Sequence, residues 1–294
     1  MSNPRQPTAR LKFIDAGNQL VPTSGYTYAE LAEIYNQARV DYIVPMPMNS
    51  KRMQEYVVHY DISLNGSVVA INEDSLPCGV GMLGLREGRS WITRLGVIPD
   101  RRKHHMGQAI MESLIESAQN HRAKTIQLEV IVGNDPARNL FEKLGFITAR
   151  ELLVIRRPPN TLTPNLAYDS IAPIPIAHGD IRTVLASRTD TPSWIEENQS
   201  LLNAGNLHGL RVATDDGAWG WIVFQRSPFQ LTHFVLNYSD DWVARALLYY
   251  VHKEYPLQDT KIENVDVHDS LWQIYQQIGY LEIFRRTEMI LDLK

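Results

Sequence analysis

A run of cationic and imidazole side chains lies where a predicted strand leads into a predicted helix. Residues 91–97 are apolar and β-prone, Pro99 ends that strand because proline has no N–H to offer, and apolar residues recur at helical spacing from Gly107. The loop between them contains Arg101, Arg102, Lys103, His104 and His105. The first helical turn has unpaired N–H groups and the positive end of the helix dipole, and a glycine lets a ligand approach the backbone. The segment therefore predicts a cradle for an anion such as a pyrophosphate, with a solvated turn or a nucleic-acid patch as alternatives.

The composition limits the classes of protein to which this chain can belong. Its length of 294 residues predicts two domains, and 44% hydrophobic and 21% charged residues are typical of a globular protein. The net charge of −4 makes the basic loop a local feature, so we expect a discrete anionic ligand and no nucleic acid. Cys78 is the only cysteine, which excludes an intrachain disulfide. The sequence contains no apolar run of about 20 residues, so we expect no membrane span. The segment MSNPRQPTAR has no hydrophobic signal core, so we expect a cytoplasmic protein.

The first half of the chain predicts the helices and strands that would position this loop. A helix is expected over 28–38, with Thr27 and Glu30 as a capping box, and a second helix begins at Asn49 or Ser50. Strands are expected at 67–71, 79–85, 91–97 and, after the central helix, 125–132. A helix over 134–144 ends at Gly145, which suits a C-terminal cap, and 146–156 forms a last strand.

The second half repeats this order after residues 158–175, a segment rich in Pro, Asn and Thr that we interpret as a linker. Helices are expected at 178–188, 192–203, 242–253 and 270–278, and strands at 210–213, 220–225, 231–236, 261–267 and 281–293. An ungapped comparison of 128–146 with 262–280 places Glu129 on Glu263 and Gly145 on Gly279. The basic loop is not repeated, because residues 237–242 include two aspartates and neither a glycine nor a cation. We therefore expect no pyrophosphate site in the second half.

The segment 97–109 resembles the acyl-CoA loop of the GNAT acetyltransferase superfamily. That pattern has Val-x-Pro at the end of a strand and then Arg-x-x-Gly-x-Gly; here Val97, Pro99, Arg102 and Gly107 match it, and His105 stands at the first glycine. The order of elements in each half is also that of the superfamily. The resemblance implies an α/β (α+β) fold of two tandem GNAT-like domains, each a central mixed sheet flanked by helices. The expected domains are 1–157 with the acyl-CoA site and 176–294 as a degenerate copy, joined by 158–175.

The resemblance also implies acetyl-CoA as the cofactor and a set of residues that bind it. These are Leu95, Gly96, Val97, Arg102, Lys103, His104, His105, Met106, Gly107, Gln108, Ala109, Asn134 and Phe141. Leu95 and Val97 would offer backbone groups to the pantetheine arm, and Asn134 would help to seat it, cap the following helix, or do both.

Acyl transfer to an amine needs a base, donors for the oxyanion and often an acid for the thiolate. Glu129 lies in a Leu-Glu-Val strand that resembles the one that carries the base in GNAT enzymes, and the alternative is a side chain that faces solvent. Phe141 stands where many family members have the tyrosine that protonates the thiolate, and phenylalanine has no proton to give. The thiolate would then leave unassisted, or Tyr42 or Tyr56 would replace that tyrosine.

These features predict an N-acetyltransferase that transfers an acetyl group to a primary amine of a small molecule by direct attack. The alternative is a protein that binds acetyl-CoA or a small ligand without turnover. Residues that could line the acceptor groove are Tyr26, Tyr28, Tyr42 and Met46. We expect no metal, because the adjacent pair His104 and His105 has no supporting cluster of ligands. A monomer or a homodimer is expected.

Overall fold

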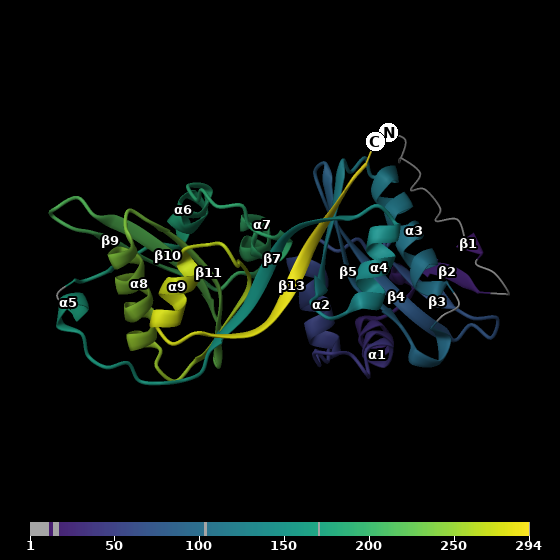
Figure 1. Ribbon diagram of the computed structural model, residues 1–294, viewed down its shortest axis with the longest axis horizontal. Coiled ribbons are helices and arrows are strands. Elements are labelled where there is room, and N and C mark those ends of the chain that lie inside the picture. The colour runs from purple at the N-terminus through teal and green to yellow at the C-terminus, as the bar shows by residue number, and fades with distance from the viewer. Residues whose placement is uncertain (1–11, 14–17, 103–104, 170, 294) are drawn as a thin grey trace. The chain divides into compact units, whose positions relative to one another are not determined.

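The computed structural model describes residues 12–13, 18–102, 105–169 and 171–293, and the chain divides into two compact units (Figure 1). The first unit comprises residues 1–149 and 288–294, and the second comprises 150–287. Strands β7 (Ile147–Arg157) and β13 (Leu281–Asp292) therefore contribute residues to both units. The domain boundaries at 157/158 and 175/176 stay predictions, and the unit boundary along β7 lies at 149/150.

The first unit is a mixed sheet with helices on both faces. Its elements are β1 (Lys12–Phe13), β2 (Gln19–Pro22), α1 (Tyr28–Ala38), α2 (Ser50–His59), β3 (Val68–Ile71), β4 (Pro77–Arg86), β5 (Arg89–Val97), α3 (Met106–Asn120), β6 (Thr125–Ile131), α4 (Asp135–Lys143), the start of β7 and the end of β13. The strands follow the order β1-β2-β3-β4-β5-β6-β13. Neighbours are antiparallel from β1 to β5, whereas β5 and β6 are parallel.

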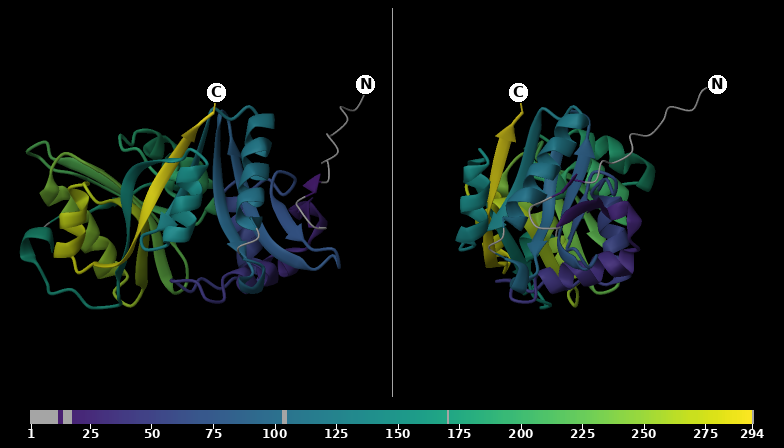
Figure 2. Two further views of the ribbon diagram at one scale, coloured as in Figure 1. Left: turned by 45° about the vertical axis from the view of Figure 1, so that its right-hand side comes forward. Right: turned by 90° about the vertical axis from the view of Figure 1, so that its right-hand side faces the viewer.

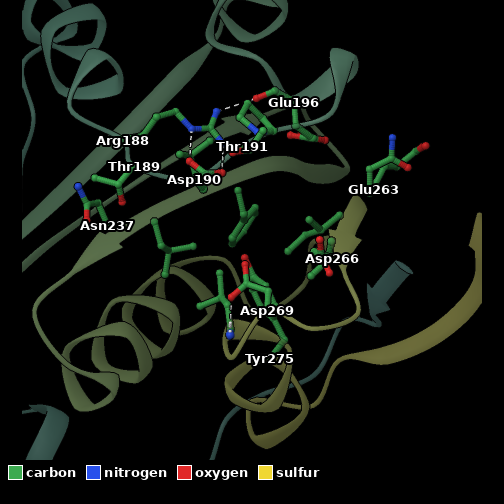
Figure 3. Close-up of a pocket in the computed structure, with 18 of the residues that line it drawn as sticks. Arg188, Thr189, Asp190, Thr191, Glu196, Asn237, Glu263, Asp266, Asp269 and Tyr275 are labelled. Carbon is green, nitrogen blue, oxygen red and sulfur yellow. Dashed lines mark hydrogen bonds and ion pairs between the residues drawn. The ribbon is translucent and has the colours of Figure 1, made fainter. Parts of the chain in front are cut away.

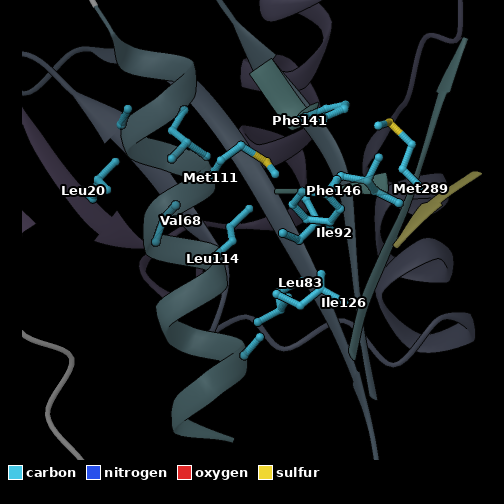
Figure 4. Packing of buried hydrophobic residues seen from close by; sticks show 14 of the residues in the cluster. Leu20, Val68, Leu83, Ile92, Met111, Leu114, Ile126, Phe141, Phe146 and Met289 are labelled. Carbon is cyan, nitrogen blue, oxygen red and sulfur yellow. The ribbon is translucent and has the colours of Figure 1, made fainter. Parts of the chain in front are cut away.

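Glycines in β4 and β5 allow helices to approach the sheet closely. A Cβ at Gly81 would lie 2.5 Å from the Ile110 side chain of α3, and a Cβ at Gly96 would lie 2.9 Å from Ala38 of α1. Gly96 pairs with Val80, the neighbour of Gly81, and successive residues of a strand face opposite sides. Helices α1 and α3 therefore cover opposite faces of the sheet. The buried core lies on the α3 face and includes Leu83, Ile92, Met111, Leu114, Ile126, Phe141 and Phe146 (Figure 4).

The last residues of the chain complete the core of the first unit. Met289 has no exposed surface and packs in the same cluster as Phe146, and Leu291 and Leu293 pack against it. The backbone N–H of Leu293 donates to the carbonyl of Lys124 at 2.7 Å. Both views in Figure 2 show the C-terminal end of yellow β13 beside strands of the first unit. The expected second domain, residues 176–294, does not account for this return of the chain to the first unit.

The second unit repeats the layers of the first. Its elements are the rest of β7, α5 (Leu166–Asp169), β8 (Ile174–Pro175), α6 (Ile181–Ala186), α7 (Asn198–Ala204), β9 (Leu207–Ala213), β10 (Trp219–Arg226), β11 (Gln230–Tyr238), α8 (Asp241–Glu254), β12 (Asp259–Asp266), α9 (Leu271–Gln277) and the start of β13. The strand order is β13-β7-β12-β11-β10-β9-β8. Ile222 and Phe224 of β10 pack with α8, whereas Trp221 and Val223 pack with α6 and α7. The helices again cover both faces.

The predicted fold class is confirmed, since each unit is a mixed sheet flanked by helices. The capping box of Thr27 and Glu30 is formed, Asn49 caps α2, and Gly145 has a φ of +92° just after α4. Four short elements were not predicted, namely β1 and β2 before the first helix, and α5 and β8 within the expected linker. Among the described residues, no helix has both the length and the apolar character that a membrane span requires.

Candidate active site

Strands β5 and β6 pair at one end and separate toward the other. Their parallel register runs from Arg89 opposite Thr125 to Trp91 opposite Gln127, and no later pair joins them among the described residues. Beyond this point the backbone of β5 faces an opening in the sheet. The basic loop and α3 follow directly from the end of β5 at Val97. An extended ligand arm that entered here could pair with β5 as an added strand.

A bulge in β5 lies at the mouth of this opening. Thr93 pairs with Met82 and Gly96 with Val80, so Arg94 and Leu95 together face the single residue Gly81. Arg94 has a φ of +54°, the left-handed conformation that a bulge of this kind requires. The extra residue takes backbone groups of β5 out of the ladder with β4. Such a bulge is a place where a strand can direct backbone groups out of the ladder.

The first turn of α3 keeps the form expected of an anion cradle. Its N-cap, His105, has φ 54° and ψ 7°, so an exposed histidine adopts the conformation for which glycine is favoured, and its side chain does not cap the helix. A Cβ at Gly107 would meet only the side chains of Leu140 and Val97, at 3.5 and 3.8 Å. Met106 is buried in the core and fixes this turn on the sheet. Lys103 and His104 lie outside the described residues.

Arg102 anchors the loop to neighbouring protein groups. Its Nη1 and Nη2 atoms donate to the two carboxylate oxygens of Asp41 at 2.6 and 2.7 Å, and its Nε donates to the carbonyl of Val97 at 3.0 Å. The hydrogen bonds from Arg102 lower the pKa of Asp41 below its usual range, and the same bonds raise the pKa of Arg102. The guanidinium is therefore engaged by this chain, and direct contact of its side chain with a cofactor stays a prediction.

Three other expected cofactor residues on this helix and strand also have partners within the protein. The Gln108 amide donates to Glu112 at 2.8 Å and accepts from Lys143 at 3.0 Å. Leu95 packs partly buried against the core, and Ala109 donates its N–H to the carbonyl of His105 as the first helical bond. The contributions of these residues to a cofactor site would come from their backbone positions.

Glu129 projects from β6 on the face opposite the core. Its neighbours Leu128 and Val130 are buried in that core, whereas Glu129 is half-buried and accepts a hydrogen bond from the indole Nε1 of Trp91 at 2.7 Å. Trp91 is 3% exposed and lies against the rings of Tyr56 and Tyr60, with centroids 6.0 and 5.8 Å away. The carboxylate thus lies beside an aromatic wall on the α1 and α2 face of the sheet, in place of the fully solvated position that was the alternative.

Arg94 and Tyr56 form the next layer of this wall. The Arg94 guanidinium lies 4.1 Å from the centre of the Tyr56 ring, donates to the Tyr35 hydroxyl at 2.9 Å and approaches the sulfur of Met46 at 4.0 Å. The Tyr56 hydroxyl bonds to that of Thr93 at 2.6 Å, and burial raises the pKa of Tyr56 to about 12. A phenol of that pKa is a poor proton donor to a thiolate, because the thiol that would form has an ordinary pKa of about 8.5 and is the stronger acid.

Asn134 and Tyr42 meet at the start of α4. The Asn134 side chain accepts from the N–H of Ala137 at 3.4 Å, as an N-cap does, and its Nδ2 donates to the Tyr42 hydroxyl at 3.3 Å. The Arg39 guanidinium lies 3.3 Å from the centre of the Tyr42 ring. Phe141, from the same helix, is 5% exposed and packs on Phe146 in the core. Tyr42 therefore brings a hydroxyl to the helix on which Phe141 has none.

The second unit has the same framework without the anion cradle. Strands β11 and β12 pair only at Gln230 with Asp259 and Leu231 with Thr260, and a bulge in β11 has His233 at φ +54°. The N-terminus of α8, however, is capped by its own Asp240, which accepts from the N–H groups of Trp242 and Val243 at 3.0 and 3.1 Å. This carboxylate occupies the donors that a phosphate would need.

The family and the fold are identified by comparison with known proteins. Residues 30–146 match the sequence model described as the acetyltransferase (GNAT) family, and this part of the chain belongs to that family. No curated protein matches the chain in sequence. As the resemblance implied, the fold is that of tandem GNAT proteins.

Solved structures extend the similarity of fold over most of the chain. A GCN5-related N-acetyltransferase from Sphaerobacter thermophilus has a TM-score of 0.70 at 16% identity, over 94% of this chain and 95% of that one. A tandem GNAT protein from the clavulanic acid biosynthesis pathway has a TM-score of 0.63 at 12% identity, over 94% and 98%. A GCN5-related N-acetyltransferase from Kribbella flavida has a TM-score of 0.57 at 13% identity, over 94% and 71%.

The family and the geometry agree on the type of chemistry. Family membership supports acyl-CoA-dependent N-acyltransferase activity in general, and the family uses acetyl-CoA as its co-substrate. The residues present fit that group, because the first turn of α3 has no side-chain cap from His105 and β5 no longer pairs with β6 beyond Trp91. Among the described residues, no three His, Cys, Asp or Glu side chains gather as a metal site would require.

Proposed function

We propose that the first unit transfers an acetyl group from acetyl-CoA to the primary amine of a small molecule by direct attack in a ternary complex. The observation that carries the proposal is the hydrogen-bonded pair of Trp91 and Glu129, which lies on the strands that separate next to the α3 cradle. Acetyl-CoA supplies the acyl group as a thioester. The N–H groups at the start of α3 would bind its pyrophosphate, and the open edge of β5 would hold its extended arm.

Glu129 is the proposed general base. Trp91 holds the carboxylate in one orientation, and an ammonium group that approached from the α1 and α2 face would lose its proton to Glu129, directly or through one water. The backbone of β5 at the Arg94 bulge is the proposed oxyanion site, because it lies where the two strands separate.

Tyr42 is the proposed acid for the departing thiolate. Its hydroxyl lies against Asn134 at the start of α4, whereas the Tyr56 hydroxyl is bonded to Thr93 and its pKa is raised by burial. Of the two tyrosines that could replace the family residue at Phe141, the geometry favours Tyr42.

A second candidate function is binding of acetyl-CoA or a small ligand without turnover. Phe141 favours it, because phenylalanine has no proton to give at the position where many family members have tyrosine. The deciding experiment measures release of the coenzyme A thiol over a panel of primary amines. Turnover with at least one amine, lost in Glu129→Gln, supports the enzyme. Calorimetric binding of coenzyme A with no turnover on any amine supports the second candidate.

A further inference from the structure

The second unit contains a cavity of about 580 Å³ in the place where its strands separate (Figure 3). The ends of β11 and β12 form its floor, and the loop 188–192 and the segment from β12 to α9 form opposite walls. Its volume lies within the range of small-molecule sites in proteins, roughly 300–1,000 Å³. The apolar part of the lining includes Phe234, Leu236, Ile262, Val265, Leu271 and Tyr275.

Two arginines in the lining hold one wall in place. Arg188 donates to both carboxylate oxygens of Asp190, at 2.6 and 2.5 Å, and to the carbonyl of Glu196 at 2.7 Å. Arg150 donates to the carbonyl of Thr191 at 2.8 Å and lies 3.6 Å from the carboxylate of Asp266. Because both guanidinium groups brace the loop, they are poorly placed to bind an anionic ligand.

Four of the five carboxylates in the lining have cationic or titratable partners. Asp190 and Asp266 lie on the two arginines, and Glu196 and Glu263 have partners of their own. Glu196 bonds to the imidazole of buried His233 at 3.1 Å. Glu263 lies 2.7 Å from Arg286 and 2.6 Å from Lys261, and these cations lower the pKa of Glu263 although burial by itself would raise it.

Asp269 has no such partner. Its carboxylate accepts the N–H of Leu271 at 2.9 Å, and no cation among the described residues pairs with it. Figure 3 shows Asp269 and Asp266 on the wall opposite Asp190. Asp269 lies at an exposed part of the cavity lining. Partial burial raises its pKa, the hydrogen bond from the Leu271 N–H opposes this, and the charges of Asp190 and Asp266 add to the rise.

We infer that this cavity binds a small organic cation, in which an ammonium group meets Asp269 and an apolar body contacts Tyr275 and its neighbours. The ammonium would supply the cationic partner that Asp269 lacks, and the apolar walls would be removed from water. The inference does not rest on the activity of the first unit. Because Asp240 caps α8, a ligand with a phosphate group is the class that this unit would exclude.

The test uses the full chain and calorimetry with two probes, phenethylammonium and n-butylammonium. We expect saturable binding of at least one probe. The neutral analogue of the probe that binds, 2-phenylethanol or 1-butanol, should bind at least tenfold more weakly, and 3-phenylpropionate should not bind. Asp269→Asn keeps an oxygen to accept from Leu271 and should weaken binding at least fivefold, whereas Glu254→Gln, on the exposed end of α8, should leave it unchanged.

A second variant tests the location without touching a charge. Thr189 lines the cavity from an exposed loop, and Thr189→Trp should fill the space, abolish binding and leave the unfolding temperature unchanged. Absence of binding for both ammonium probes would overturn the inference. So would binding that is equally tight in wild type, Asp269→Asn and Thr189→Trp, because the probe would then lie elsewhere, for example in the acceptor site of the first unit.

Discussion

The indole N–H of Trp91 donates to the carboxylate of Glu129 at 2.7 Å, across the point where β5 and β6 cease to pair. The bond links the last paired residue of one strand to a residue just past the pairing on the other. A carboxylate held in this way is oriented before any ligand arrives, which is the condition that positioned proton transfer requires.

Glu129→Gln should therefore remove base catalysis while it leaves the fold and cofactor affinity intact. We expect kcat/KM for the best amine to fall by about 10²- to 10⁴-fold, because a positioned base contributes roughly that factor. Trp91→Phe, which frees the carboxylate, should cost less. Glu55→Gln on the exposed side of α2 is the matched control. An unchanged kcat/KM in Glu129→Gln would exclude this residue as the base.

Tyr42→Phe should lower kcat, because it removes the hydroxyl next to Asn134. A loss of about tenfold or more is expected if that hydroxyl protonates the thiolate. The loss should shrink for acyl donors whose thiols have lower pKa values, since these leave without help. Tyr56→Phe is the comparison, and its effect should appear mainly as reduced stability, because it leaves Thr93 without its buried partner. A larger drop in kcat for Tyr56→Phe would reverse the assignment.

Arg102→Glu should weaken acetyl-CoA binding by about tenfold or more without unfolding the protein, because it replaces the anchor of the loop with a charge that repels Asp41. The double variant Arg102→Asp with Asp41→Arg separates two explanations. Recovery of most of the affinity would mean that Arg102 acts by holding the loop. If affinity stays as low as in Arg102→Glu, the guanidinium itself contacts the cofactor. Calorimetry with coenzyme A measures the affinity of the single and of the double variant.

His105→Gly should stabilise the protein, because a side chain in the left-handed region costs roughly 1–2 kcal/mol, of which the added flexibility of glycine offsets a part. A net gain of about 0.5–1 kcal/mol would raise the unfolding temperature by about 1–3 °C. Affinity for coenzyme A should be retained or improved. His105→Ala keeps the left-handed strain and should give no gain. A lower unfolding temperature in His105→Gly would show that the imidazole itself contributes to the loop.

His252 in the second unit should make stability depend on pH. Burial, and then the charge of Arg157, lower its pKa from 6.5 to about 3. Between about pH 3 and pH 6.5 the unfolded chain binds a proton that the folded chain does not. The contribution of His252 to the free energy of unfolding is therefore fully present above about pH 6.5 and is lost as the pH decreases. The expected slope from this group is about 1 kcal/mol per pH unit.

Urea unfolding of the wild type and of His252→Asn at pH 7 and pH 5 measures this slope. His233 works in the opposite direction, because Glu196 raises its pKa although burial by itself would lower it. The comparison of the two proteins cancels that contribution. His252→Asn should lose less stability than the wild type between pH 7 and pH 5. Equal losses would mean that His252 already titrates normally in the folded protein.

Much of the fold and the place of the site could be predicted from local pattern. The capping box at Thr27, the break at Pro99 and the cap at Gly145 depend on residues close together in the chain, and each marks the end of an element. The repeat that places Gly145 on Gly279 holds in the structure, where the two glycines have φ values of +92° and +95°. The left-handed conformation of His105 shows that the backbone of the cradle is kept although the expected glycine is not.

The sequence by itself thus determined the order of the main elements, the basic loop at a helix start and the strand that carries Glu129. Only the tertiary structure decided that Arg102 pairs with Asp41, 61 residues away, that Tyr42 meets Asn134, 92 residues away, and that Met289 returns to the first core. Periodicity reports which face of an element is apolar, because helices and strands repeat over short intervals. The partner of a polar side chain depends on how those faces pack, and residues distant in sequence meet only when the chain has folded.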